Sequence, residues 1–276
     1  MDFIVLFTNI CVKAVQNNVC IIAICIMLNH FHIEAEFESS KAMYRFMNGL
    51  TSVVARAQNR YYHLSGQVFK KSFKNAPKFS TRKIKDNFIY IGNNPIEKNA
   101  TSRPEEYRWN FIKYLDSPTP FSEPVDPMTA SELLINLIRE VKRYHEEGKA
   151  IGYKSLKNIY KLDKKEQNQL VDFIVSTYSV IDKKKVIAIF GSYEELLTAI
   201  NSVTGSEYDI FDEETGDNYR HYYEMIKISK EEGFDLNEMH FSEKTRNDER
   251  IKKLSYRFMT EANASEYEVA KFFHLL

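Results

Sequence analysis

The feature that most limits the fold of this chain is an apolar run from Val19 to Leu28, followed by an alternating segment from His30 to Phe37. The run has half of the roughly 20 residues that a membrane-spanning helix needs. Its Val, Ile, Ala and Cys residues favour a strand that is buried on both faces. The second segment alternates between polar and apolar residues, the period-two pattern of a strand. We expect the two strands to pair as an antiparallel hairpin in an α+β fold.

Helical periodicity surrounds this predicted hairpin. One helix is expected over 3–15, and a second runs to about Tyr62 after a cap at Ser39 or Ser40. A third helix is expected over 80–93, because Pro95 lacks the backbone donor that a helix interior requires.

Prolines indicate the domain boundary, since four of the seven fall between 118 and 127. We predict a first domain at 1–116, a Pro-rich linker at 117–128 and a mostly helical C-terminal domain at 129–276. An amphipathic helix from Ala130 to Glu146 opens this second domain.

Charge is segregated along the chain although the net charge is zero. Between Lys41 and Asp116 there are 15 Lys or Arg residues against 5 Asp or Glu, and the remainder carries 23 against 33. A basic segment of this kind predicts an anionic partner, since clustered cations release counterions from a phosphate backbone.

The cysteines and the N-terminus favour a cytoplasmic protein. Cys11, Cys20 and Cys25 form no CxxC pair and no even disulfide framework, so reduced and buried thiols are expected. Asp2 stands where a secretory signal would be basic, and no membrane association is predicted.

Two pairs of residues could carry chemistry. His30 and His32 leave the same face of a strand and can converge on one ion if a third ligand joins them. Tyr90 and Asn94 lie one helical turn apart, so a phenol and a carboxamide oxygen can face one phosphate. Either pattern alone is also typical of structural residues.

Four segments, in this order and spacing, resemble the HUH single-tyrosine transposases and, within them, the REP-associated tyrosine transposases of bacteria. The likeness covers about 3–115, and Leu28 stands where the family usually has proline. The segments are Met27–Ile33 around the two histidines, Gly66–Phe69 before the basic residues, Phe88–Ile96 around Tyr90, and the aromatic residues Tyr107, Trp109 and Tyr114.

The resemblance implies a metal-dependent nickase and strand transferase for single-stranded DNA. Tyr90 would attack a phosphodiester and form a 5′-phosphotyrosine, while His30, His32 and Asn94 would hold Mg²⁺ or Mn²⁺. The basic and aromatic residues that fit such a substrate are Arg56, Arg60, Phe69, Lys70, Lys71, Lys74, Lys78 and Lys83.

The resemblance also implies a ferredoxin-like antiparallel sheet with helices on one face. The family's domain usually opens with a strand that pairs beside the HUH strand, whereas this chain begins at the helix that follows it. Either the start codon is misassigned, or this is a decayed copy that lacks the first strand. In the second case backbone groups beside the site would lack strand partners. The segment 254–273 resembles the first half of a helix-turn-helix.

Three functions follow from these observations. The leading expectation is a transposase that nicks and rejoins single-stranded or hairpin DNA, as a monomer or a homodimer. A second is a non-catalytic DNA-binding relic or regulator derived from such an enzyme. A third is a metal-dependent phosphodiesterase that uses the two histidines with water.

Overall fold

The predicted hairpin is present: β1 (Cys20–Ile26) pairs antiparallel with β2 (Phe31–Glu36). This computed structural model describes residues 1–69, 72–78, 80–202, 220–233, 249–266, 269 and 272. Within these ranges the chain is mostly helical and the hairpin is the whole sheet. A ferredoxin-like sheet is therefore not seen in the described residues, and the coarser α+β class is what the structure supports.

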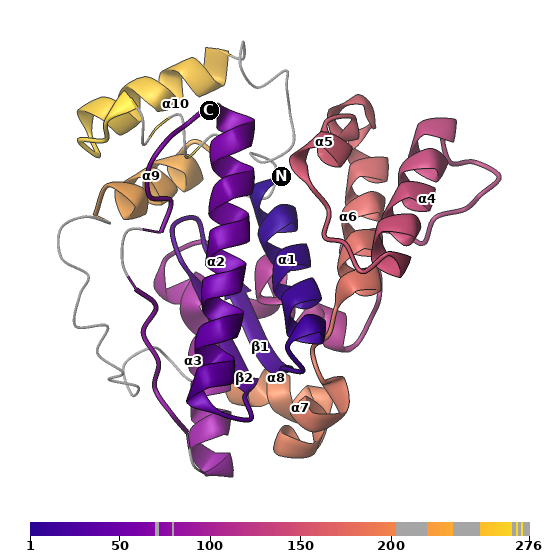
Figure 1. The fold of residues 1–276 in the computed structure, drawn as a ribbon. Helices are drawn as coiled ribbons and strands as arrows, with labels where there is room; N and C mark the ends of the chain where they lie inside the picture. Colours follow the sequence, from indigo (N-terminus) through magenta and orange to yellow (C-terminus); the bar gives the residue numbers. More distant parts are fainter. Residues whose placement is uncertain are drawn as a thin grey trace.

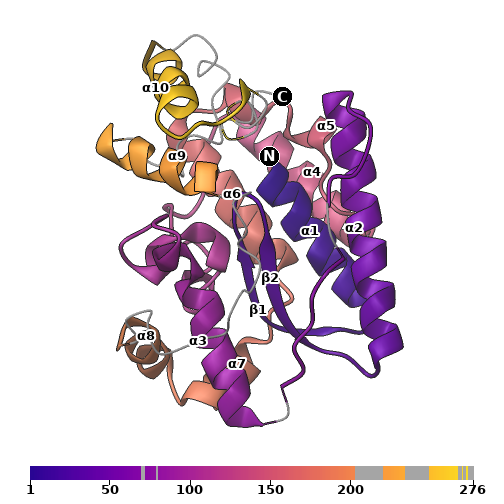
Figure 2. The same ribbon diagram turned by 90° about the vertical axis from the view of Figure 1, so that its left-hand side faces the viewer.

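Helices cover both faces of this hairpin (Figure 1). Figure 2 shows α1 (Asp2–Gln16) and α2 (Ser40–Tyr62) on one side and α3 (Thr81–Glu97) on the other. The expectation of helices on one face is wrong. The reason is that β1 is buried along Ile21–Ile26, so both of its faces must be covered.

Local sequence predicted where α2 begins but not where α3 ends. The Ser39 side chain accepts a hydrogen bond of 3.2 Å from the Ala42 amide, as expected of a helix cap. Helix α3, however, continues through Pro95 to Glu97 instead of stopping near residue 93. Its residues 88–95 are all buried, so packing outweighs the hydrogen bond that proline removes.

The outer edge of β1 has partners from outside the hairpin. Ile21 forms a parallel bridge with Ile181, and its carbonyl accepts a 2.9 Å hydrogen bond from the Asp182 amide. At the other end of β1 the Tyr107 hydroxyl donates to the Ile26 carbonyl at 2.8 Å. These contacts satisfy two carbonyl groups that a neighbouring strand would otherwise bind.

The rest of the chain is built from short helices. They are the 3₁₀ turns η1 (Pro104–Glu106), η2 (Arg108–Asn110), η3 (Lys113–Leu115) and η4 (Ile159–Lys161), and the α-helices α4 (Glu132–Glu146), α5 (Tyr153–Leu156), α6 (Lys164–Tyr178), α7 (Lys183–Phe190), α8 (Tyr193–Ser202), α9 (Arg220–Glu231) and α10 (Glu249–Thr260).

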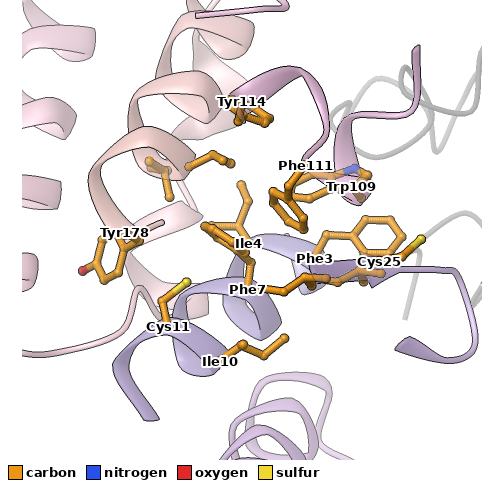
Figure 3. Packing of buried hydrophobic residues seen from close by; sticks show 14 of the residues in the cluster. Phe3, Ile4, Phe7, Ile10, Cys11, Cys25, Trp109, Phe111, Tyr114 and Tyr178 are labelled. Carbon is orange, nitrogen blue, oxygen red and sulfur yellow. The ribbon is translucent and has the colours of Figure 1, made fainter. Parts of the chain in front are cut away.

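One apolar core runs across the Pro-rich segment that separates the two predicted domains. Figure 3 shows side chains of α1 between the Trp109 and Phe111 segment and Tyr178 of α6. Phe3 stacks on Trp109 with ring centroids 5.1 Å apart, and Phe7 stacks on Phe111 at 4.4 Å. Residues from both sides of the segment therefore exclude water together.

In the described part of the chain, none of the helices combines the length and the apolarity that crossing a bilayer requires. The three cysteines are free thiols, and Cys11 and Cys25 are buried.

Candidate metal and tyrosine site

The candidate site lies where β2 packs against α3. His30 and His32 leave the hairpin on the face that α3 covers, and their ring centroids are 5.0 Å apart in an edge-to-face arrangement. The Tyr90 ring of α3 meets the His32 ring edge to face at 5.7 Å. The structure thus brings the two histidines together with a tyrosine that follows them by 60 and 58 residues in sequence.

Asn94 completes this arrangement. Its Oδ1 atom lies 3.2 Å from Nε2 of His30, one helical turn beyond Tyr90. The described residues contain no cluster of three or more His, Cys, Asp and Glu side chains. A third protein ligand beside the two histidines would therefore be the Asn94 carboxamide oxygen.

The two ring nitrogens of His30 both face carboxamide oxygens. Nδ1 lies 2.6 Å from Oδ1 of Asn29, and a carboxamide oxygen can only accept, so this contact is a hydrogen bond in the tautomer that carries the ring proton on Nδ1. The Nε2 lone pair then faces the Asn94 oxygen. A metal ion between these two atoms would accept an electron pair from each of them.

The spacing of two of these donors fits an octahedral divalent ion. Neighbouring ligands of an octahedral ion with bonds of about 2.1 Å are about 3 Å apart, close to the 3.2 Å between His30 and Asn94. Asn29 then acts as the outer partner that fixes the ring tautomer, a common arrangement at metal-bound histidines. The amide nitrogen of Asn94 is buried and has no hydrogen-bond partner among the described residues.

Glu34 extends the same face of β2. The side chain is 7% exposed, and neither carboxyl oxygen has a hydrogen-bond partner within 3.5 Å in the described part of the chain. Burial raises the pKa of Glu34 from 4.5 to about 7, while Asn87 of α3 and the Lys78 charge act in the opposite direction. The strand thus places a carboxyl two residues from His32, opposite Ala23 of β1.

The Tyr90 side chain is only 9% exposed. Near the site, a second apolar cluster formed by α9, α10 and the residues after them packs against Leu28 and Ala100. Leu28 precedes Asn29, and Ala100 follows α3. Tyr90 is therefore largely shielded from solvent in this arrangement.

The predicted DNA-binding residues are spread over both sides of the hairpin. Arg56 and Arg60 are exposed on α2, which lies on the side away from α3 (Figure 2). Phe69 packs edge to face on Phe31 with centroids 6.1 Å apart. Lys78 lies near enough to Glu34 to lower the pKa of that carboxyl.

The remaining predicted contacts are less closely connected to the site. Lys74 and Lys83 are exposed, and Lys83 lies in the first turn of α3. Lys70 and Lys71 fall outside the described residues.

Three polar residues at the site were missed by the sequence analysis: Asn29, Glu34 and Asn87. Glu34 continues the period-two spacing of His30 and His32, and Asn87 precedes Tyr90 by one helical turn. Spacing could have placed both on the correct faces. It could not have shown that they face each other.

Comparison with protein-family models, with curated proteins and with solved structures finds no match to this chain.

Proposed function

We propose that this protein nicks and rejoins single-stranded DNA through a covalent tyrosine intermediate, as HUH single-tyrosine transposases do. The observation that carries the proposal is the convergence of Tyr90, His32, His30 and Asn94 on one site from a strand and a helix. We propose further that the β1–β2 hairpin corresponds to the HUH-bearing part of the family's ferredoxin-like sheet.

In this function Tyr90 is the nucleophile. Its phenol oxygen forms a bond to phosphorus while the bond to the 3′ oxygen breaks, leaving a 5′-phosphotyrosine and a free 3′-hydroxyl. One phosphoester replaces another, so a 3′-hydroxyl of another strand can reverse the step without an energy source. His30, His32 and Asn94 would hold Mg²⁺ or Mn²⁺, which supplies positive charge to the scissile phosphate.

The substrate class rests on charge and shape. Single-stranded DNA, alone or next to a DNA hairpin, offers both a phosphate backbone and exposed bases. The exposed cations Lys74, Lys83, Arg56 and Arg60 can neutralise the backbone, and Phe69 supplies an aromatic surface.

The test incubates the protein with single-stranded oligonucleotides and Mg²⁺ or Mn²⁺ and looks for a covalent protein–DNA band in a denaturing gel. We expect Tyr90→Phe to abolish the band, because it removes only the attacking oxygen. The matched control is Tyr256→Phe, which alters an exposed tyrosine of α10 and should leave the band unchanged.

Other outcomes identify the alternatives. A band that persists in Tyr90→Phe shows that the nucleophile is another residue. A free 5′-phosphate without an adduct indicates the phosphodiesterase. Binding of the oligonucleotide without cleavage indicates the non-catalytic DNA-binding protein.

Metal binding has a separate readout. Electron paramagnetic resonance of Mn²⁺ titrated with the protein should show binding that His30→Ala weakens, whether or not DNA is cleaved.

A further inference from the structure

The solvent side of α2 carries charge of one sign only. No Asp or Glu occurs between residues 39 and 85 of the sequence. The buried residues of α2 are Phe46, Leu50 and Val54, which share one side of the helix. The other side carries four exposed cations, Lys41, Arg45, Arg56 and Arg60.

This charge pattern destabilises the helix. Lys41 and Arg45 are four residues apart, as are Arg56 and Arg60, and like charges at this spacing repel each other. In the described part of the chain, none of the four forms an ion pair. Helix α4, in contrast, mixes three Lys or Arg with three Glu, as exposed helices usually do. The α2 pattern therefore indicates a polyanionic partner, whose phosphates would remove the repulsion.

An exposed aromatic pair lies beside the first two cations. Tyr44 is 52% exposed, and its ring contacts that of Phe73 with centroids 5.2 Å apart. Lys41 and Arg45 flank Tyr44 on the helix, and exposed Lys74 follows Phe73. Cations that bind phosphates next to rings that stack on bases are typical of surfaces for single-stranded nucleic acid. A duplex keeps its bases stacked inside and offers no free base to the ring.

The chain after α2 returns along the helix and brings Phe73 to Tyr44. The Asn59 side chain donates to the Gly66 carbonyl at 2.9 Å near the end of α2. Near its start, Nδ2 of Asn75 lies 3.7 Å from the Met43 sulfur. Two contacts on α2 therefore hold the aromatic pair together with the basic face.

We propose that the exposed side of α2, together with Phe73, is a second binding surface that holds single-stranded DNA by phosphate contacts and by stacking on Tyr44. The proposal rests on the proposed function for the choice of DNA. Because α2 and the Tyr90 helix lie on opposite sides of the hairpin (Figure 2), this surface holds a part of the strand that is not cut. From Lys41 to Arg60 the helix spans about 28 Å, enough for several nucleotides.

The first test isolates binding from chemistry. Fluorescence anisotropy of a labelled oligonucleotide of about 12 nucleotides is measured with EDTA in a Tyr90→Phe background, where no adduct forms. We expect Tyr44→Leu to weaken binding roughly fivefold or more, because it removes the stacking ring. Tyr44→Phe keeps the ring and should bind as the parent does. Tyr256→Leu, at an exposed tyrosine of α10, is the matched control and should have no effect.

The second test counts phosphate contacts. Lys41→Gln combined with Arg45→Gln should make the slope of log affinity against log salt shallower by about 1.4, at about 0.7 for each contact with a single strand. Arg139→Gln is the control, because it removes an exposed cation of α4, and it should leave the slope unchanged.

Adduct formation gives a third readout where Tyr90 is present. Tyr44→Leu should raise the oligonucleotide concentration that gives half the maximal rate. The single-turnover rate at saturation should stay the same, because the surface lies apart from the phenol.

The outcomes separate this surface from the nickase. Binding that depends on Tyr44, with no adduct in the wild type, leaves the surface in place and refutes the nickase. An adduct formed by the wild type, with unchanged binding in Tyr44→Leu, refutes the surface alone. A duplex of the same sequence that binds as tightly as the single strand, or a protein that binds phosphatidylserine vesicles but no oligonucleotide, also overturns the proposal.

Discussion

At the scale of single residues, the site combines side chains that are costly to bury. His30 has carboxamide oxygens at both ring nitrogens, and Glu34 is buried without a close hydrogen-bond donor. Neither arrangement is what packing alone would select. Both are explained if the face of β2 toward α3 is kept for chemistry.

Asn29 should control metal affinity without touching the metal. Asn29→Ala removes the oxygen that holds the Nδ1 proton of His30, and loss of such a partner typically costs about 10- to 100-fold in affinity. Asn29→Asp keeps an acceptor and should bind Mn²⁺ at least as well as the wild type in paramagnetic resonance titrations. Equal affinity in the alanine variant would contradict the assigned tautomer.

Glu34 should make stability depend on pH. Its pKa rises from 4.5 to about 7 on folding, so the folded state binds the proton more tightly. Stability is then greatest below the unfolded pKa and falls as pH rises through 7, by about 3 kcal/mol for this group. The positive charge of Lys78 limits the rise of the Glu34 pKa.

The measurement is urea unfolding with EDTA between pH 5 and 8. The difference in free energy of unfolding between Glu34→Gln and the wild type should grow toward pH 8. A difference that stays constant with pH would show that Glu34 does not titrate in this range.

At the scale of elements, a buried ion pair joins the end of the first predicted domain to α6. The carboxylate of Asp172 accepts hydrogen bonds from Arg108 at 2.5 Å and from the Tyr114 hydroxyl at 2.6 Å. It also accepts from the Phe121 amide and the Ser122 hydroxyl. Tyr107, the residue before Arg108, donates a hydrogen bond to the end of β1, so these two adjacent residues connect the β1–β2 hairpin to α6.

Removing one partner of this network should lower the free energy of unfolding strongly. Asp172→Leu leaves the Arg108 guanidinium buried without its partner, which typically costs about 3–5 kcal/mol of unfolding free energy. Chemical denaturation measures the loss. The control is Glu123→Gln, which breaks the exposed pair with Lys165 and should change nothing measurable. A mild effect of Asp172→Leu would mean that water reaches Arg108.

At the scale of the whole molecule, one apolar cluster joins the first predicted domain to residues up to α8 of the second, apart from the cluster of α9 and α10. Phe7 of α1 and Ile174 of α6 belong to the same buried cluster, although the Pro-rich segment lies between them in sequence. Shared burial couples the stability of the two parts.

Unfolding of the described core should therefore be a single transition. Phe7→Ala and Ile174→Ala should each lower the same urea midpoint, with losses of about 2–5 kcal/mol. Val15→Ala, at an exposed position of α1, is the control and should have little effect. Two transitions, each shifted by one variant only, would instead support independent domains at 1–116 and 129–276.

The sequence by itself determined the local features of this protein. Periodicity indicated the hairpin and α2, Ser39 indicated a cap, and spacing placed the two histidines, and Tyr90 with Asn94, on common faces. These features depend on neighbours within a few residues, so they can be read from the chain.

Only the tertiary structure decided which faces meet. It put α3 on the opposite side of the hairpin from α2, carried α3 through Pro95, and brought Ile181 to the edge of β1. The physical reason is that burial rewards contacts between distant segments, and local periodicity shows which face is apolar but not what covers it.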